Sequence, residues 1–413
     1  MALKTKNIKI KELGVVITGG TPPTKQRQYY GDSVPLIKPT DMVLGQRYIG
    51  KTDESLSELG VDKFKKKLVP ANTPCIVTIG TIGKSCLTKE VSLVNQAVNC
   101  VVVDSEQYDS MYVYYLLKST IPVVKSLNSG TASGRENVSK SVFENIEVKV
   151  VIDKGKQCKI GKSLSYYDSL IENNIRRILI LEEMAVSLYK EWFVKRQIPP
   201  QIFEQLSHDK FPDSWKTKSL GDVLETIIDY RGKTPKKLGG DWVDKGIKAL
   251  SALNVKNGEL IRLDSCKKVD KTIYDKWMKI KLTRGDMLLT SEAPLGEVAI
   301  LNKDSEFCLS QRLYALRADE SLISKEYLFL SFFSGHLINE LTSRSTGSTV
   351  AGIRQALLKE IPIVIPPEKV MREFTKLVSP ILEQKSMLWH KNKNLEKQRD
   401  MLVPKLLSGD VDL

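Results

Sequence analysis

The sequence has few residues of the kinds that bind metals or form disulfide frameworks. It contains only three histidines among 413 residues, and its cysteines show no close pairing. We therefore expect neither a zinc site nor disulfides, and a reduced cytoplasm is the simplest location. No run of about eighteen apolar residues is present, and the start Met1-Ala2-Leu3-Lys4 lacks a signal-peptide core, so no membrane segment is expected.

Catalytic motifs are also lacking. The stretch Gly80–Ser85 is similar to a nucleotide-binding loop, but Thr78 stands where that motif needs glycine. The matching turn, Gly296-Glu297, carries a carboxylate that would repel phosphate. No Asp/Asn-Pro-Pro-aromatic methyltransferase motif or Gly-rich dinucleotide fingerprint occurs, and the histidines have no matching neighbours in the repeat. We expect a non-catalytic chain, with a nuclease built on scattered Asp, Glu and Lys as a remote alternative.

The composition is that of a globular protein with a basic bias. Hydrophobic residues make up 41% and charged residues 27%, and the net charge is +14. A chain of this length can bury two or three domains. The positive charge is spread along the sequence, which is compatible with contact to nucleic acid but is weak evidence alone.

A long helix is predicted from Lys162 to about Arg196, because its inner heptad positions are almost all apolar or aromatic. These positions are Leu164, Tyr167, Ile171, Asn174, Ile178, Leu181, Ala185, Leu188 and Trp192. Shifted by 214 residues, the same frame predicts a C-terminal partner helix. Its inner positions are Val378, Ile381, Lys385, Leu388, Asn392, Leu395, Arg399, Leu402 and Leu406. The polar members of the seam are either tolerated or fix the register and antiparallel orientation of the pair.

The two halves of the chain are predicted to be copies of each other. The matched segments are Leu13-Gly14 with Leu220-Gly221, Gly20–Pro22 with Lys233–Pro235, Leu36–Asp41 with Ala249–Asn254, Ile82-Gly83 with Leu295-Gly296, Asn95-Gln96 with Ser310-Gln311, and Ile146 with Ile361. Each copy is expected to be mixed α/β. The predicted strands are Cys75–Ile79, Asn99–Val103, Met287–Thr290 and Tyr314–Arg317, and the predicted short helices are Tyr112–Ser119 and Tyr327–Ser334.

The expected fold is α+β, with two similar domains separated by two long antiparallel helices that form a coiled coil with pseudo-two-fold symmetry. The boundaries are 1–150 for the first domain, 151–197 for the central helix, 198–366 for the linker and second domain, and 367–413 for the terminal helix. A helix of about 30 residues spans roughly 45 Å, or roughly 13 base-pair steps of duplex DNA. Two domains on such a spacer suit a target with two sites at a fixed separation.

The order of several segments resembles the specificity subunits of type I restriction-modification enzymes. The segments are the Gly-x-Thr-Pro block ending at Pro22, Tyr189–Phe193 at the end of the central helix, Ile198–Pro200, Pro212–Lys216, Gly232–Pro235, Ile363–Pro367 and Leu406–Asp410. The resemblance covers essentially the whole chain, although the first copy enters its helix through Val150–Asp153 without paired prolines.

The resemblance implies a non-catalytic subunit in which two target-recognition domains read the halves of a bipartite site in double-stranded DNA. It also implies that the chain docks two methyltransferase subunits and restriction (motor-nuclease) subunits. S-adenosylmethionine, ATP and Mg²⁺ are then expected in those partners, with no cofactor in this chain. The alternative is a duplicated protein-interaction scaffold whose basic charge is incidental.

Candidate DNA contacts are Lys, Arg and small polar residues in loops at matching places of the two copies. In the first copy they are Thr21, Lys25, Arg27, Lys38, Thr40, Thr81, Lys84, Asn95, Gln96, Thr131 and Arg135. In the second copy they are Arg231, Lys233, Thr234, Lys236, Ser251, Asn254, Ser291, Ser310, Gln311, Arg312, Arg344, Ser345, Thr346, Ser348 and Arg354. The residues of the first pair of loops, 21–27 and 231–237, could instead be solvated basic turns. Strand or turn caps are the alternative for Lys38, Thr40, Ser251, Asn254, Asn95, Gln96, Ser310 and Gln311. The last pair of loops, 128–137 and 343–354, could have no function.

Overall fold

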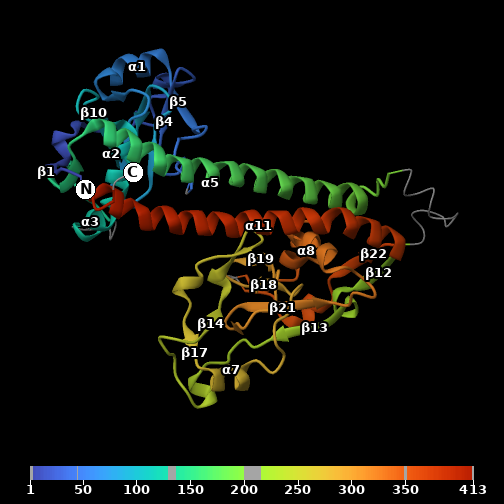
Figure 1. Cartoon of the computed structure of the whole chain (residues 1–413). Coiled ribbons are helices and arrows are strands. Elements are labelled where there is room, and N and C mark those ends of the chain that lie inside the picture. The colour runs from blue at the N-terminus through green and yellow to red at the C-terminus, as the bar shows by residue number, and fades with distance from the viewer. Residues whose placement is uncertain (1–2, 44, 129–135, 200–214, 348–350, 412–413) are drawn as a thin grey trace. The chain divides into compact units, whose positions relative to one another are not determined.

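The computed structural model describes residues 3–43, 45–128, 136–199, 215–347 and 351–411 (Figure 1). The chain divides into two compact units. Unit 1 comprises Met1–Arg176 and Leu388–Leu413, and unit 2 comprises Arg177–Met387. Both long helices therefore contribute one segment to each unit. No described helix has a stretch long and apolar enough to cross a membrane.

Each unit contains a four-stranded antiparallel sheet with the same strand order. In unit 1 the order is β2 (Gly14–Thr18), β10 (Val98–Val103), β7 (Pro74–Val77) and β8 (Ser85–Leu87). In unit 2 it is β13 (Leu224–Asp229), β21 (Leu313–Ala318), β18 (Met287–Ser291) and β19 (Leu295–Ile300). The helix after β10 is α2 (Ser110–Ser119), and the one after β21 is α8 (Lys325–Phe333). All the predicted strands and short helices are confirmed, as is the duplication.

A second sheet in each unit is built around a parallel pair of short buried strands. In unit 1 its order is β3 (Tyr30–Gly31), β5 (Glu54–Leu56), β4 (Val34–Ile37), β9 (Ser92–Val94) and β6 (Leu68–Val69). In unit 2 it is β17 (Lys268–Val269), β14 (Ile247–Leu250) and β20 (Cys308–Leu309). Leu36 pairs with Leu93, and Ala249 pairs with Cys308 in the same way. These pairs reproduce the sequence offsets of 213 and 215 residues, so the alignment of this region is confirmed.

A two-stranded ladder precedes the long helix in each unit. The ladders join β1 (Thr5–Lys9) to β11 (Glu147–Val151) and β12 (Lys216–Ser219) to β22 (Pro362–Ile365). The hydrogen bonds beside these ladders show that one predicted match, that of Leu13 with Leu220, is wrong. The amide of Leu220 donates to Ile361, as that of Ile10 donates to Ile146, while Leu13 and Val223 each accept from an aspartate amide. Leu220 is thus equivalent to Ile10, and the Leu-Gly identity was shifted by three residues.

The long helices are α5 (Lys154–Tyr189), followed by a π-helical turn (Lys190–Val194), and α11 (Glu368–Leu407). The helix α5 begins eight residues before the predicted Lys162. In place of paired prolines, Asp153 starts α5 by accepting a hydrogen bond from the amide of Lys156. The other α-helices of the described residues are α1 (Glu58–Phe64), α3 (Ile121–Ser126), α4 (Lys140–Glu144), α7 (Lys271–Trp277), α9 (Ile338–Ser343) and α10 (Gln355–Lys359).

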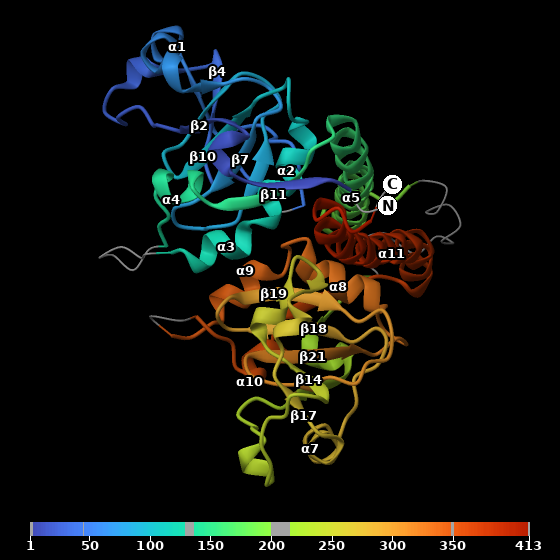
Figure 2. The same ribbon diagram turned by 60° about the vertical axis from the view of Figure 1, so that its left-hand side comes forward.

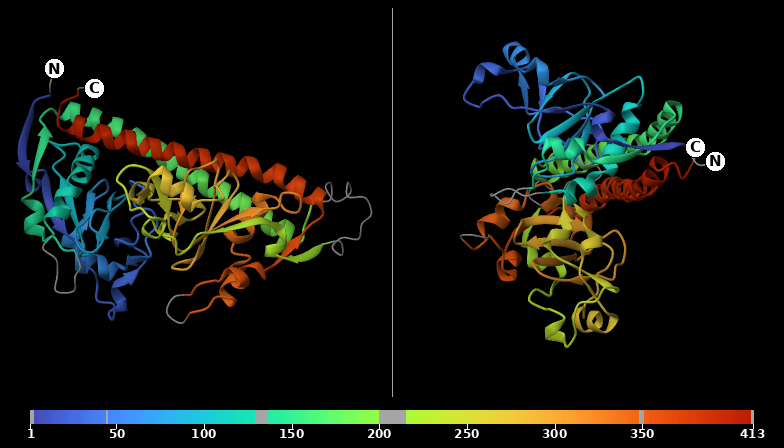
Figure 3. Two further views of the ribbon diagram at one scale, coloured as in Figure 1. Left: turned by 90° about the horizontal axis from the view of Figure 1, so that it is seen from below. Right: turned by 90° about the vertical axis from the view of Figure 1, so that its left-hand side faces the viewer.

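In each unit the two helix segments run side by side (Figure 3). In unit 1, Asp168 contacts Arg399 and Asn174 contacts Asn392, so the partner number falls as the chain advances and the pair is antiparallel. The predicted seam is confirmed, since its apolar members Leu164, Ile178 and Val378 are buried. The polar members of the seam are buried too: Asn174, Lys385, Asn392 and Arg399.

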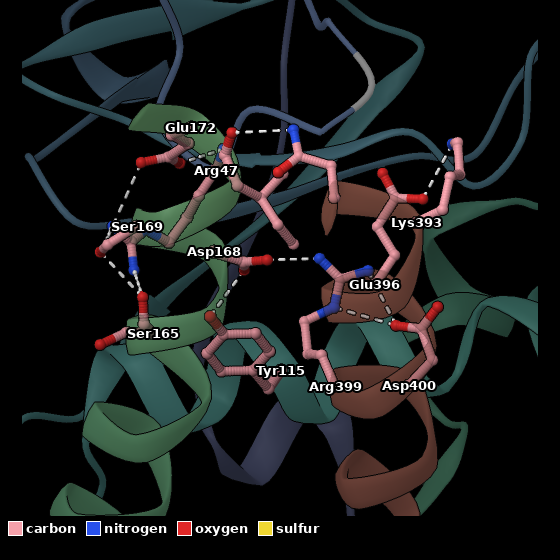
Figure 4. Close-up of polar contacts among 12 residues, drawn as sticks. Arg47, Tyr115, Ser165, Asp168, Ser169, Glu172, Lys393, Glu396, Arg399 and Asp400 are labelled. Carbon is pink, nitrogen blue, oxygen red and sulfur yellow. Dashed lines mark hydrogen bonds and ion pairs between the residues drawn. The ribbon is translucent and has the colours of Figure 1, made fainter. Parts of the chain in front are cut away.

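The polar seam residues make specific contacts that tie the rest of each unit to the long helices. In unit 1, Asp168 of α5 binds Arg399 of α11 and also accepts a hydrogen bond of 2.6 Å from Tyr115 of α2 (Figure 4). In unit 2, Lys385 of α11 lies 3.1 Å from both Glu182 of α5 and Glu259 at β16 (Glu259–Leu260). Each buried charge is therefore paired across three elements, which supports the interpretation that these residues fix the register.

The short helix after the central sheet packs between that sheet and the long helices. Figure 2 shows α8 between the central sheet of unit 2 and α11. The centroid of the Tyr327 ring of α8 lies 4.8 Å from that of Phe193 and 5.6 Å from that of Tyr189. In unit 1 the matching Tyr112 of α2 is fully buried, and its hydroxyl accepts a hydrogen bond of 3.0 Å from the amide of Val151. The ring contacts of unit 2 hold α8 against the end of α5, and the hydrogen bond of unit 1 holds α2 against the end of β11.

Replacing Tyr112 by phenylalanine is expected to change how stability depends on pH. Burial raises the pKa of Tyr112 from 10.0 to about 12 in the folded state. A raised pKa gives stability that is present below the unfolded pKa and is lost as pH rises through the folded one. In Tyr112→Phe, the free energy of unfolding at pH 8 should be lower by about 1 kcal/mol, because the hydrogen bond is lost. In wild type the free energy of unfolding should fall by about 2–3 kcal/mol more between pH 10 and 12 than in Tyr112→Phe, because the variant has no hydroxyl to ionise.

Urea unfolding at pH 8, 10, 11 and 12 measures this change. Tyr166→Phe, at an exposed tyrosine of α5, is the control and should leave the slope of stability against pH unchanged. An unchanged slope in Tyr112→Phe would show that ionisation of this hydroxyl is not linked to unfolding.

Candidate nucleic-acid interface

In each unit the predicted DNA-contacting loops converge at one edge of the sheets. In unit 1 the strands β2, β4, β7 and β9 all end where β10 begins. Backbone hydrogen bonds join the loops that follow: Gly20 donates to Val94, Asn95 to Ile37, and Thr78 to Ala97. Unit 2 repeats the pattern, with Ser310 donating to Leu250 and Ser291 to Arg312. In unit 1, four segments that are distant in sequence thus form one polar edge, and we call the corresponding edge of each unit its loop edge.

The loop edge of unit 1 contains a hydroxyl and amide network. The Thr21 hydroxyl donates to Gln96 Oε1 and accepts from Asn95 Nδ2 at 2.8 Å. Asn95 Oδ1 also caps the amide of Ala97 at 2.8 Å. Gln96 is exposed, whereas Asn95 is half-buried. The network therefore orients Gln96, with Asn95 and Thr21 as its supports.

Basic side chains surround this network. Lys84 donates to the carbonyl of Pro39 at 2.7 Å and so joins two of the predicted loops. Lys38 forms an ion pair with Glu54 at 2.6 Å. Lys67, which the sequence analysis did not select, donates to the Gly19 carbonyl at 3.1 Å. The basic run at 65–67 was the signal that could have identified it. The other predicted residues of this edge are exposed: Lys25, Arg27, Thr40 and Thr81.

At the loop edge of unit 2, Arg231 is held in a fixed orientation. Its Nε and Nη2 lie 2.9 Å and 2.8 Å from the carboxylate oxygens of Asp229, and its guanidinium stands 4.1 Å from the centroid of the Tyr314 ring. Burial raises the pKa of Tyr314 to about 12, although the nearby Arg231 cation partly opposes this shift. Burial alone would lower the pKa of Arg231, but its hydrogen bonds to Asp229 and its charge interactions with Tyr314, Asp229 and Glu292 together outweigh burial, so this pKa lies above its ordinary value.

The neighbouring residues of unit 2 add further basic groups. Arg312 has a left-handed backbone, with φ of 63°, and its Nε lies 3.2 Å from Glu292 Oε1. Lys233 donates to the carbonyl of Trp277 at 3.2 Å. Neither Asp229 nor Glu292 was selected from the sequence, because the candidate contacts were limited to Lys, Arg and small polar residues. The remaining predicted residues here are exposed or half-buried: Thr234, Lys236, Ser310 and Gln311.

The last predicted loop of unit 2 reaches the same edge through a bridge between Glu292 and Gly352. Arg344 pairs with Glu340, and the Ser345 hydroxyl donates to the carbonyl of Thr342 at 2.7 Å. Thr346 and Arg354 are exposed. In unit 1 the equivalent bridge joins Ile79 and Asn137. Three predicted residues lie outside the described residues: Thr131, Arg135 and Ser348.

Two of the predicted contacts are wrong, because the structure buries their side chains. Asn254 is 4% exposed, and its amide binds the Ser251 backbone and the carbonyls of Ile261 and Arg262. Ser291 is 1% exposed at the end of β18. Neither can reach a ligand at the surface. The Ser251 hydroxyl points to Asn254 Oδ1 at 3.2 Å, so the capping interpretation also accounts for Ser251.

The described residues contain no group of three or more His, Cys, Asp or Glu side chains arranged to hold a metal ion. The loop edges instead offer guanidinium, ammonium, amide and hydroxyl groups. Such groups donate to phosphate oxygens and to base edges, which are the two kinds of contact that a DNA-reading protein needs.

Comparison with known proteins gives a consistent result. The family model "Type I restriction modification DNA specificity domain" matches residues 3–182 and again residues 212–396. The specificity subunit of the type I restriction enzyme MjaIX of Methanocaldococcus jannaschii is 25% identical over 417 residues, covering 98% of this chain and 92% of that protein. The HindI specificity subunit of Haemophilus influenzae is 36% identical over 141 residues, covering 34% of this chain and 30% of that protein. The crystal structure of the type I system S subunit of M. genitalium aligns with a TM-score of 0.60 at 15% identity, covering 98% of this chain and 96% of that one.

Proposed function

Because the chain belongs to the type I restriction-modification specificity subunit family, with two copies of the recognition domain, we propose that it reads a bipartite sequence in double-stranded DNA. Unit 1 reads one half of the target and unit 2 reads the other. The paired helices set the length of the unread gap between the halves.

The observation that carries this proposal is the loop edge that recurs in both units. The same strand ends assemble it in each copy, and in each copy it carries cations beside amide or guanidinium groups. A scaffold that bound proteins would require no such match between the two edges. Cations that face phosphate, together with a few donors for base edges, are what specific DNA binding requires.

The chain itself is proposed to be non-catalytic and to act inside a larger complex. Its partners are two methyltransferase subunits and the restriction subunits that drive translocation and cleavage. S-adenosylmethionine, ATP and Mg²⁺ bind in those partners under this proposal. The role of this chain is to choose where on the duplex their chemistry takes place.

The purified full-length chain should bind duplex DNA with an affinity that falls steeply as salt rises. Contacts to 6–10 phosphates would reduce the affinity by about 10³–10⁵ between 50 and 200 mM salt, because each contact releases counterions. Fluorescence anisotropy with random-sequence and selected duplexes measures this dependence. Lys25→Ala should reduce the slope of log K against log salt by about 1.

Lys376→Ala is the control, since Lys376 is an exposed lysine of α11 that pairs with Glu373 at 2.7 Å. It should leave the slope unchanged. A chain that binds no duplex, or binds without a two-part sequence preference, would support the scaffold alternative. Cleavage of DNA by the chain alone with a divalent metal would support the nuclease alternative.

A further inference from the structure

The loop edges of the two units differ in the chemistry at their centres. In unit 2, Asp229 is the last residue of β13 and pairs across the sheet with Tyr314 of β21. Arg231 lies two residues further along the chain, hydrogen-bonded to Asp229 through Nε and Nη2 and placed over the Tyr314 ring. Tyr314 is itself fixed, because it is buried and its hydroxyl donates to the carbonyl of Ile353 at 3.0 Å.

This arrangement leaves one edge of the Arg231 guanidinium for a ligand. Asp229 occupies Nε and one hydrogen of Nη2. Among the described residues, no hydrogen bond takes the Nη1 and Nη2 hydrogens of the other edge. That edge has the spacing to donate to O6 and N7 of guanine, the pair of acceptors that distinguishes G·C in the major groove. The Arg231 side chain is 32% exposed, which gives a base access to it. Because Asp229 and Tyr314 already orient the guanidinium, little conformational entropy is lost on binding.

A second arginine and a carboxylate lie beside it. Arg312 Nε is 3.2 Å from Glu292 Oε1, and both side chains are partly exposed. Glu292 is close enough to raise the pKa of both Arg231 and Tyr314, although burial of Tyr314 and the Asp229 partner of Arg231 act more strongly. Glutamate accepts hydrogen bonds from the N4 amino group of cytosine. The cluster therefore offers donors for guanine and an acceptor for its paired cytosine.

The equivalent positions of unit 1 carry no charge. Thr18 pairs with Asn99 where Asp229 pairs with Tyr314, and the Thr18 hydroxyl donates to Asn99 Oδ1 at 2.5 Å. In unit 1 the carbonyl of Ala97 accepts a hydrogen bond from the amide of Thr78. In unit 2 the carbonyl of Arg312 accepts the equivalent bond from the amide of Ser291. Unit 1 therefore has alanine at the position of Arg312. What unit 1 presents is the exposed amide of Gln96, and amides pair with adenine.

We propose that the half-site read by unit 2 contains a G·C pair recognised by Arg231, with Asp229 as its positioning residue and Arg312 and Glu292 beside it. The half-site read by unit 1 is recognised by neutral amide and hydroxyl groups. The proposal rests on the proposed function and goes beyond it by assigning a base to a residue.

Selection of duplexes from a random pool by the full-length chain tests the assignment. Wild type should yield a two-part motif, and Gln96→Ala should relax one half, which identifies the half read by unit 1. Arg231→Ala should relax a guanine position in the other half only. Its binding to the selected duplex should fall about tenfold to a hundredfold. Asp229→Asn, which keeps the arginine and removes its charged partner, should give a smaller loss at the same position.

A base analogue tests whether Arg231 contacts N7 of the guanine. Replacing the chosen guanine by 7-deazaguanine removes N7, so it should weaken binding of wild type but add little to the loss already caused by Arg231→Ala. Arg284→Ala is the matched control, because Arg284 also pairs with a carboxylate, Glu383 at 2.8 Å, but precedes β18 at its other end. It should keep the wild-type motif.

The outcomes separate this inference from the proposed function. A two-part motif whose unit 2 half contains no guanine, or keeps it in Arg231→Ala, overturns the inference and leaves the proposed function standing. A guanine analogue effect that is equal in wild type and Arg231→Ala also overturns the inference. Failure of the wild type to select any two-part motif overturns both.

Discussion

Replacing Arg399 by leucine is expected to lower the free energy of unfolding of unit 1 by about 3–5 kcal/mol. Asp168, its partner on α5, is 2% exposed, so the substitution leaves a carboxylate in the interior without its cation. Tyr115 still donates to Asp168 but carries no charge to offset it. Such a loss is a large part of the total stability of a typical domain. Urea unfolding followed by tryptophan fluorescence and circular dichroism measures the change.

Two further variants show whether the unpaired charge causes the loss. Removing the whole group, with Arg399→Leu, Asp168→Leu and Tyr115→Phe together, should bring stability back to within about 2 kcal/mol of wild type, because no buried member of the group is then left without a partner. Asp400 also loses Arg399, but its side chain is exposed. Lys393→Ala, which breaks the exposed pair with Glu396, should cost less than about 1 kcal/mol. A triple variant as unstable as the single one would assign the loss to packing of the arginine stem.

The helical seam and the central strands could be predicted because their signals are local and periodic. The heptad positions on α5 gave the buried row through Ile171 and Ile178, and the same frame identified Lys385 and Arg399 as inward-facing despite their charge. Runs of apolar residues predicted β7, which is buried throughout, and β10, which is buried over its first four residues. The spacing of apolar residues and the sequence offset between the two copies are sufficient to predict such elements, because the burial of one face determines where their apolar residues lie.

Pairing between distant residues could not be predicted in the same way. Asp168 and Arg399 are in contact because the two antiparallel helices pack in one register. The sequence around either residue does not indicate its partner. The loops show a similar limit. Their common edge follows from strand order, but whether a polar residue points outward, like Gln96, or caps the chain inside, like Asn254, depends on turn geometry. Short identities also mislead, as the shift between Leu13 and Leu220 demonstrates.

Lengthening both long helices by one heptad is expected to change the preferred DNA target more than any point substitution. The insertions belong after Arg176 in α5 and after Met387 in α11, where the two units divide. Seven residues add about 10 Å and keep the seam in register. The preferred gap should therefore grow by about three base pairs, at 3.4 Å for each step. Affinity for the original site should fall by about 10³ or more, toward non-specific binding.

Duplex selection with the lengthened chain, and methylation-site mapping with the complete complex, both measure the gap. Three base pairs also turn the duplex by about a third of a helical turn, so affinity for the longer site should be lower than that of wild type for its own site. A heptad inserted in α5 alone is the control. With one helix longer than the other, only one of the two buried ion pairs can keep its register: either Asp168 with Arg399 or Glu182 with Lys385. The variant protein should therefore unfold and should not select a new gap. If the doubly lengthened chain folds and still prefers the original gap, the helices do not set the spacing, and the distance between the half-sites must be determined by another part of the complex.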